Sequence, residues 1–397
     1  MMDRDILGRR GFLAGAGAGL GLIALGGCAS GQGGATATVG SMGPRLTLSP
    51  LRTGIADITR ITVCTRPFRP QGPRIERERI GDKDVIHHYG HGGSGWSLSW
   101  GSGAVAVDLV MATGQRDIAV IGCGAIGLTT ATLLQRAGMQ VTIYAKEMPP
   151  EVRSSYATGV WSPDSRICME EHATPAFKAQ WASMCRRSFA SFQDWLGLPA
   201  DPVQWYETYS INDLPRPVRA TDSRPPFAHL QRELVPELLV GQRQEFAPGQ
   251  HDFGNRSVRR SSNMMFNINA YTHQLLSEFL AHGGKLQVRE FHSPTDFATL
   301  PQKTLVNCTG YGARSLMRDD SLIPVRGQLA RAIPQADITY GLYYNQVSFV
   351  PRRDGLVFQQ VGDSDYYGYG EEGLAPDRTE AEQAVATIAG LFQNQAA

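Results

Sequence analysis

The sequence predicts an α/β fold in which a β-α-β unit is joined by a second part, and three observations support this prediction. A short apolar strand at 118–121 leads into a helix at 128–137 and then a second strand at 139–144. Another apolar run at 304–307 reads as a further buried strand of the same unit. Residues 166–261, rich in Trp, Pro and Arg, interrupt this alternation and predict an insertion that forms much of the second part.

The elements between these landmarks follow from local signals. Gly138 closes the first helix, as glycine commonly does at a helix end. A second helix is expected from Asn269 to Gly283, where two consecutive glycines stop it, and a strand follows from Leu286 to Glu290. No internal repeat is evident.

Composition excludes several classes of function. The chain has 397 residues, a hydrophobic fraction of 42%, a charged fraction of 19% and a net charge of +1, so no strong field would attract nucleic acid. None of the six cysteines forms a C-x-x-C pair, which argues against a zinc or thioredoxin-like site, and we predict no metal. Cys123 and Cys308 read as core residues, whereas a disulfide among the others stays open.

A glycine motif lies between the first strand and the first helix. Gly122, Gly124 and Gly127, with Ala125 and Ile126 between them, form G-x-G-x-x-G in a strand–turn–helix setting. Glycines there permit a tight turn and a close backbone approach, and the helix N-terminus faces a pyrophosphate. The motif predicts a Rossmann-like dinucleotide site, with Glu147 after the second strand as the ribose ligand. Lys146 leaves NADP as an alternative.

The first residues resemble an export signal. Arg9-Arg10, a mildly apolar stretch and Leu25-Gly26-Gly27-Cys28 resemble a twin-arginine signal joined to a lipoprotein cleavage box. This resemblance implies a periplasmic protein with a lipid anchor on Cys28, and Ala29 favours the outer membrane. A transmembrane anchor is the alternative, although the stretch is short and poor in large apolar residues.

Five segments outside the glycine motif resemble one enzyme family. With the glycine motif, they are similar to the D-amino-acid and D-aspartate oxidase family over most of residues 60–360, and Gly-His-Gly-Gly is the most specific part. The segments are 66–78 (RPFRPQGPRIERE), 85–101 (VIHHYGHGGSGWSLSWG), 157–163 (ATGVWSP), 306–310 (VNCTG) and 324–328 (PVRGQ).

The order of these segments departs from the family. There, R-P-x-R-P and Gly-His-Gly-Gly close the chain, whereas here they precede the glycine motif, so the sequence looks circularly permuted. Residues 103–113 would be the helix after Gly-His-Gly-Gly, and the new ends would fall between a helix at 379–392 and the strand before Arg66. Chain termini often lie close together, which makes such a rearrangement reasonable.

The resemblance implies an FAD-binding domain and a discontinuous β-rich substrate domain. The expected segments are a signal at 1–28, a tether at 29–59, the FAD-binding domain at 60–165 and 262–322, the substrate domain at 166–261 and 323–362, and a helical segment at 363–397 that packs on the FAD-binding domain.

Residue roles are carried over by matching motifs. Arg66 would pair with the substrate carboxylate through its planar fork, or else would be structural. His91 is interpreted as a packing residue. The backbone expected at the flavin comprises Gly92, Gly93, Ser94, Gly95, Trp96, Ser97, Gly159 and Val160, with Ser155 and Thr158 as further contacts.

The substrate end shows two departures from the family. Tyr344 matches the mobile tyrosine that covers the active site, although Tyr343 could take its place. A second tyrosine is expected four residues later, but Ser348 stands there, and Gln359-Gln360 replaces a glycine pair. These changes leave the substrate open and do not alter the expected fold.

The implied reaction is FAD-dependent hydride transfer from a D-amino acid, giving a 2-oxo acid, ammonia and hydrogen peroxide. Three alternatives stay open: an enzyme acting on glycine, sarcosine or a secondary amine; a dehydrogenase passing electrons to a quinone instead of oxygen; and a non-catalytic FAD-binding lipoprotein. A homodimer is also left open.

Overall fold

The computed structural model describes residues 45–215, 222–239, 241 and 243–393. The predicted signal, the lipid-anchor cysteine Cys28 and most of the tether therefore lie outside the described residues. None of the described helices combines the length and the apolar character needed to cross a bilayer.

A six-stranded sheet carries the predicted β-α-β unit, in the order β2-β3-β10-β4-β5-β9. Every neighbouring pair is parallel except β2 and β3, so an antiparallel strand closes one edge. The four strands predicted for this sheet, at 118–121, 139–144, 286–290 and 304–307, agree with the observed ones to within two residues, whereas β2 and β3 were not predicted. The strands are β2 (Arg74–Ile80), β3 (Lys83–Tyr89), β4 (Asp117–Ile121), β5 (Gln140–Ala145), β9 (Lys285–Val288) and β10 (Thr304–Asn307).

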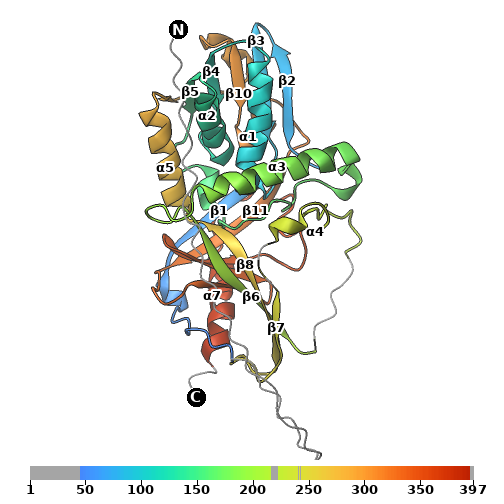
Figure 1. The fold of residues 1–397 in the computed structure, drawn as a ribbon, viewed down its shortest axis with the longest axis vertical. Coiled ribbons are helices and arrows are strands. Elements are labelled where there is room, and N and C mark those ends of the chain that lie inside the picture. Colours follow the sequence, from blue (N-terminus) through green and yellow to red (C-terminus); the bar gives the residue numbers. More distant parts are fainter. Residues whose placement is uncertain (1–44, 216–221, 240, 242, 394–397) are drawn as a thin grey trace, which may run out of the picture. The chain divides into compact units, whose positions relative to one another are not determined.

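Helices cover this sheet. α1 and α2 pack side by side against it, and α3 crosses α1 on the way to the second sheet (Figure 1). α1 begins at Gly95, eight residues before the expected start, because its first turns carry core side chains such as Leu98 and Trp100. The helices are α1 (Gly95–Met111), α2 (Ala125–Arg136), α3 (Pro175–Gln193) and α5 (Ile268–Ala281), with short helices α4 (Gln231–Leu234) and α6 (Ala313–Leu316).

One glycine explains how closely α1 and α3 approach. A Cβ atom on Gly101 would lie 2.0 Å from the carbonyl oxygen of Met184 in α3, so only glycine fits at that point. The Gly101 amide also donates to the Ser188 hydroxyl, at 2.8 Å. Trp100 and Tyr271 then join α1 to α5 by a buried hydrogen bond of 2.7 Å.

The second part is an eight-stranded sheet in the order β1-β11-β14-β13-β12-β6-β8-β7, antiparallel except between β12 and β6. Its strands come from widely separated segments of the chain. They are β1 (Ile58–Phe68), β6 (Val203–Asp213), β7 (Gln244–Phe246), β8 (Arg256–Phe266), β11 (Ile323–Ala332), β12 (Tyr340–Tyr344), β13 (Val347–Arg352) and β14 (Gly355–Gln360).

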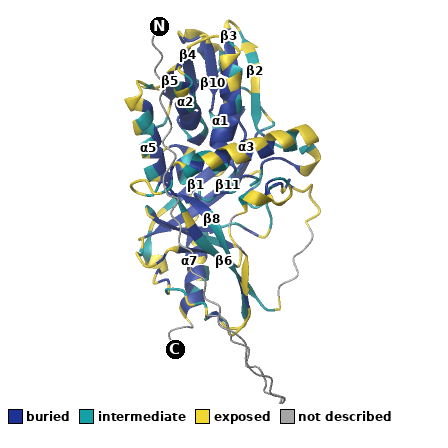
Figure 2. Ribbon diagram, viewed as in Figure 1, coloured by how far each residue is buried: buried dark blue, intermediate teal, exposed yellow. Residues whose placement is uncertain are grey.

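The C-terminal helix corrects one prediction. α7 (Arg378–Gln393) packs on β11, β13 and β14 of the eight-stranded sheet, not on the FAD-binding part as expected for residues 363–397 (Figure 1). Its apolar stripe, which includes Ala381, Val385 and Ile388, belongs to the same buried cluster as Leu342 and Phe349. Part of α7 is accordingly coloured as buried in Figure 2. This spacing fits one helical face, and the matching apolar surface lies on the eight-stranded sheet.

Two further segments differ from the expected division. β1, assigned to the FAD-binding part, pairs with β11 in the eight-stranded sheet. α3, assigned to the substrate part, packs on α1. Both chain segments therefore cross the expected boundary, because sequence position alone does not say which sheet a strand joins.

Candidate active site

One large cavity runs between the two sheets. Its volume is about 1330 Å³, above the 300–1,000 Å³ typical of a pocket for one small ligand. The glycine motif lines one end, and residues of β1, β6, β8, β12, β13 and β14 line the other. A dinucleotide and a separate small molecule can therefore share it.

The glycine motif forms a backbone cradle at the start of α2. Gly122 has a φ of 107°, and a Cβ there would lie 2.6 Å from the Cys308 carbonyl oxygen. Gly122, Gly124, Ala125 and Ile126 line the cavity. Gly127 does not, because it faces the strand: its Cβ would meet the Gly122 carbonyl oxygen at 2.0 Å. The third glycine thus allows close helix–strand packing.

The predicted ribose ligand also faces the cavity. Glu147 lines it two residues after β5 ends at Ala145. Lys146, which left NADP as an alternative, lies 3.5 Å from a Glu290 oxygen at the surface. An acidic neighbour of this kind makes the strand end a poor place for an extra phosphate.

The Gly-His-Gly-Gly loop packs on residues 165 and 166. A Cβ on Gly92 would lie 1.9 Å from the Arg166 carbonyl oxygen, and one on Gly93 would lie 2.4 Å from the Ser165 hydroxyl. Gly92, Gly93, Gly95 and Trp96 line the cavity. Missing side chains therefore let two backbone segments come together beside the ligand space.

Two serines expected at the flavin lie outside the cavity lining. Ser94 donates from its hydroxyl to the Ser165 carbonyl at 3.0 Å, and the Ser97 hydroxyl accepts from the Ser162 amide at 2.8 Å. Both side chains are buried and tie the glycine loop to residues 162–165. Their side chains therefore position the loop, and the contact of their backbone with the flavin stays a prediction.

The loop from Ser154 to Val160 forms another wall. Thr158, Gly159 and Val160, which were predicted to contact the flavin, line the cavity, whereas Ser155 is buried outside it. Its neighbour Ser154 lines the cavity instead and accepts a 2.9 Å hydrogen bond from the Ala125 amide at the N-terminus of α2. The 3-10 turn at Arg153–Tyr156 (η2) rotates successive side chains in different directions, which a motif match could not resolve.

Buried arginines hold this loop in place. Arg352 donates to the Ala157 carbonyl at 2.8 Å, and Arg331 donates to the Ser155 carbonyl at 3.2 Å. Asp354 forms ion pairs with both. The cavity wall is therefore fixed from behind by charge-assisted hydrogen bonds.

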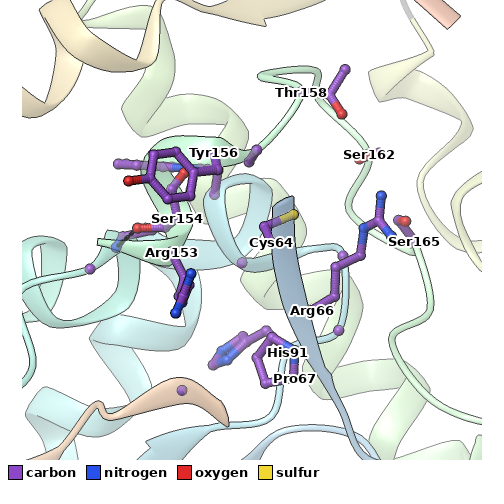
Figure 3. Close-up of a pocket in the computed structure, with 18 of the residues that line it drawn as sticks. Cys64, Arg66, Pro67, His91, Arg153, Ser154, Tyr156, Thr158, Ser162 and Ser165 are labelled. Carbon is purple, nitrogen blue, oxygen red and sulfur yellow. Dashed lines mark hydrogen bonds between the residues drawn. The ribbon is translucent and has the colours of Figure 1, made fainter. Parts of the chain in front are cut away.

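Two arginines, Arg66 and Arg166, line the cavity close enough for their charges to interact. Arg66 projects from β1 toward the loop that carries Ser162 and Ser165 (Figure 3), and it donates to the Arg326 carbonyl at 3.0 Å. Arg166 was not predicted, yet it also lines the cavity. Burial, with the nearby Arg66 charge, lowers the Arg166 pKa to about 10, although Asp365 partly offsets this.

A tyrosine assignment is also corrected. Tyr343 lines the cavity, whereas Tyr344 points to the opposite face of β12, where its hydroxyl lies 3.3 Å from Asp213 and Arg256. Successive strand residues point to opposite faces, so only one of the pair can face the cavity. Ser348 and Gln359 line it as well, and Gln359 hydrogen-bonds to Thr158.

The histidines beside the glycine loop are buried and uncharged. Burial lowers the pKa of His91 to about 3, and burial also lowers the pKa of His88 well below its ordinary value. His91 lies 3.1 Å from the Ser102 hydroxyl, which itself donates to the Leu98 carbonyl. His91 is therefore packed as a buried residue, and it also belongs to the cavity lining.

The comparisons with known proteins agree with this architecture. A family model described as FAD dependent oxidoreductase matches residues 117–396, so the chain belongs to that family of flavoproteins. A D-amino-acid oxidase from Rubrobacter xylanophilus is 33% identical over 212 residues, which is 53% of this chain and 58% of that protein. One from Dictyostelium discoideum is 24% identical, covering 70% of this chain and 74% of that protein.

Solved structures show distant likeness. An iminodiacetate oxidase from Chelativorans matches with a TM-score of 0.46 and 14% identity, covering 69% of this chain and 79% of that one. A glycine oxidase from Geobacillus kaustophilus matches with a TM-score of 0.42 and 14% identity, covering 62% and 71%. The aligned part spans little more than half the length of the Rubrobacter relative.

FAD is the cofactor of this family, and the cavity fits it. The cradle at Gly122–Ile126 would hold the pyrophosphate at the N-terminus of α2, and Glu147 would hold the ribose. The loops at Gly92–Trp96 and Thr158–Val160 present backbone where side chains at Gly92 or Gly159 would collide. They would hold the isoalloxazine ring.

Proposed function

We propose that this protein oxidatively deaminates D-amino acids to 2-oxo acids, ammonia and hydrogen peroxide. The observation that carries the proposal is the position of Arg66, in the same cavity as both loops that would hold the flavin ring. A planar guanidinium suits a carboxylate, and Arg166 adds a second positive charge beside it.

FAD, when bound, supplies the acceptor for the substrate's Cα hydride, and oxygen takes up the electrons. The chain's own residues then need only bind, orient and exclude water. Arg66 would anchor the carboxylate, and the Tyr343 hydroxyl could reach the same group from β12. The resulting imine is hydrolysed by water, which gives the 2-oxo acid and ammonia.

No strong base is required for this route. His88 and His91 are the histidines that line the cavity within the described residues, and burial depresses the pKa of both. The hydrogen on Cα leaves as a hydride, so no base has to remove it as a proton. The substrate's ammonium group loses one proton before this step, which gives the neutral amine. The alternatives are another amine substrate or a quinone acceptor, and Ser348 and Gln359 are the residues that favour a changed substrate.

The test is an anaerobic titration of the yellow holoprotein with D- and L-amino acids. Bleaching by D-forms alone supports the proposal, and peroxide yield with and without an artificial acceptor separates an oxidase from a dehydrogenase. Arg66→Met should raise KM by at least tenfold, whereas Arg77→Met, on the exposed strand β2 outside the cavity, should not. Bleaching by neither form would refute the proposal.

We also propose that the chain is circularly permuted. β3 pairs with β10 and β1 pairs with β11, so the segment before the glycine motif completes both sheets. Leu51, before β1, lies in the same hydrophobic cluster as Phe392 at the end of α7. A reordered chain, with residues 117–393 linked to residues 45–113, should fold and bind FAD. Failure to fold with linkers of several lengths would contradict this arrangement.

Export and lipid anchoring are proposed from the sequence alone. Replacing Arg9 and Arg10 by lysine should stop export, and Cys28→Ala should release the exported protein from the membrane fraction. Cys64→Ala is the matched control, because that cysteine is buried in the folded part. Membrane retention of the Cys28 variant would exclude the lipid anchor.

A further inference from the structure

Three buried ionic side chains lie behind the loop that forms the cavity wall at 154–160. Arg352 is 1% exposed, Arg331 is 7% exposed, and Asp354 forms ion pairs with both. None of the three lines the cavity. Two arginines and one aspartate carry one net positive charge, and neither arginine pairs with any other carboxylate in the described part of the chain. These three residues form the arginine cluster.

The surroundings leave that positive charge uncompensated. Burial lowers the pKa of Arg331, the charge of Arg352 lowers it further, and Asp354 offsets only part of this effect. Arg331 also has a buried Nε atom without a hydrogen-bond partner in the described structure. Arg60 adds a further positive charge nearby, and its own partner Glu151 is 3.9 Å away at the surface. A buried excess of positive charge is unfavourable by itself, so a negative charge beside it is favoured.

Arg352 fixes the direction of one peptide group in the cavity wall. Its Nη1 atom donates to the Ala157 carbonyl at 2.8 Å. The carbonyl and the following N–H of a trans peptide point in opposite directions, so the Thr158 amide points away from the arginine. That amide donates no hydrogen bond within the described residues, and Thr158 lines the cavity. The arginine therefore holds, on the side of the wall away from itself, an N–H donor that the described residues leave unpaired.

The same arginine packs against the residue that follows this donor. A Cβ atom on Gly159 would lie 3.4 Å from the Arg352 Cδ atom and 3.5 Å from its Nη1 atom. Gly159 itself lines the cavity, so at this point only the backbone of the wall separates the guanidinium from the ligand space. The charge of the arginine cluster therefore acts on whatever occupies this part of the cavity. The acidic lining residues come from other segments and are Glu147, Glu290, Asp320 and Glu372.

A flavin ring held by this wall would respond to the charge behind it. Reduction at neutral pH gives the ring two electrons and one proton, so the ring gains one negative charge. A buried positive charge nearby and an N–H donor in the wall both stabilise that negative charge. Because the dielectric constant is lower here than in water, the effect is stronger than it would be at the surface. The reduced form of the flavin is thus favoured over the oxidised form.

We propose that the arginine cluster raises the reduction potential of the bound flavin. Arg331 and Arg352 are positioning residues, because they act through the loop and lie outside the space that cofactor and substrate would fill. A higher potential makes the flavin a stronger acceptor for the hydride of an amine. This inference rests on FAD as the cofactor of the family and not on the proposed amino-acid substrate, so each can fail without the other.

The test changes the charge of the arginine cluster in both directions in the full-length holoprotein. Arg331→Met makes the cluster neutral and keeps the hydrogen bond from Arg352 to the loop, whereas Asp354→Asn adds one positive charge. One charge at about 10 Å, at an effective dielectric constant of about 20, changes such an equilibrium about tenfold. Arg331→Met should therefore lower the potential by about 30 mV, which is tenfold for a two-electron couple, and Asp354→Asn should raise it by about as much.

The potential is measured against a reference dye during slow anaerobic reduction, with no amino acid present. Arg331→Lys keeps the charge and should restore the potential of the unaltered protein. Arg353→Met is the matched control, because it removes one positive charge from an exposed side chain that is paired with Asp201. Its potential should not change. Circular dichroism and flavin content show which variants are folded.

Opposite shifts in Arg331→Met and Asp354→Asn support the inference. If Asp354→Asn does not fold, a loss in Arg331→Met that Arg331→Lys restores supports it as well. An unchanged potential in Arg331→Met, or shifts of the same sign in both charge variants, would overturn it. If the expected shifts are seen but no amino acid bleaches the flavin, the proposed function alone fails.

Discussion

Acidification should destabilise this protein well above the pH at which carboxylates titrate. His88 and His91 are buried beside the glycine loop, and burial holds the pKa of His91 at about 3 and that of His88 well below its ordinary value. Thr130 donates its own proton to the Ile126 carbonyl, so the His88 Nδ1–H must donate to it, which leaves Nε2 unprotonated and without a partner in the described structure. A second proton on His88 would be an unpaired buried charge, and one on His91 would be a charge on a buried ring.

The magnitude follows from proton linkage. Between pH 6.5 and about pH 3 the unfolded chain binds a proton at His91 and the folded chain does not, so stability falls as the pH falls. Going from pH 7.5 to pH 5.0, His91 alone should cost about 2 kcal/mol, with a further loss from His88. That is a large fraction of the roughly 5–15 kcal/mol by which proteins of ordinary stability stay folded.

Equilibrium urea unfolding, followed by tryptophan fluorescence at pH 7.5 and pH 5.0, measures this loss. His91→Gln keeps a donor for Ser102 but cannot take up a proton, so its free energy of unfolding should depend less on pH by about 2 kcal/mol. His282→Gln, at the exposed end of α5, serves as the matched control. An equal pH dependence in His91→Gln and the unaltered protein would refute the reasoning.

Three further pairs of variants probe separate features. Gly127→Ala should lose flavin and melt at a lower temperature, because its Cβ would lie 2.0 Å from the Gly122 carbonyl oxygen. Gly390→Ala in α7 places no atom within 4 Å of the new Cβ, so its free energy of unfolding in urea should rise by about 0.5 kcal/mol. Tyr343→Phe should raise KM about tenfold with little change in the free energy of unfolding. Tyr344→Phe should lower the free energy of unfolding by about 1 kcal/mol and leave the steady-state kinetics unchanged. The reverse pattern would show that Tyr344, and not Tyr343, faces the substrate. Glu380→Gln should lower the free energy of unfolding in urea by about 2 kcal/mol, because it removes the ion-pair partner, at 2.8 Å, of the largely buried Arg326. Glu382→Gln should lower it by less than about 0.5 kcal/mol, because its partner Arg378 is exposed.

Local patterns predicted the elements around the nucleotide end well. The strands at 118–121 and 304–307 are apolar runs bounded by polar or glycine residues. A continuous apolar run is typical of a strand that is buried on both faces, and both strands are buried in this way. Gly122 and Gly127 are required by close backbone contacts, and such contacts are why the motif is recognisable. Sequence signals of this kind are local, so they do not depend on which distant segment packs against them.

Packing between distant segments was less predictable. The apolar stripe of α7 predicts that one face of the helix is buried, but it does not identify the surface that covers this face. That surface comes from β11, β13 and β14, which lie 18 or more residues before α7 in the chain. Arg166 carries no local signal for its place in the cavity. It enters because a left-handed turn, with φ of 50°, lets its carbonyl meet the Gly92 backbone.

The site errors share one cause, which is the direction of a side chain within a correctly placed segment. Tyr343 and Tyr344 differ by one position on β12, and Ser154 and Ser155 by one position in a 3-10 turn, yet in each pair only one residue reaches the cavity. A one-residue step reverses the face of a strand, so a motif match that is correct to within one residue still leaves the catalytic side chain undecided. The same alternation separates Arg259, which lines the cavity, from Arg260, which is paired with Glu207.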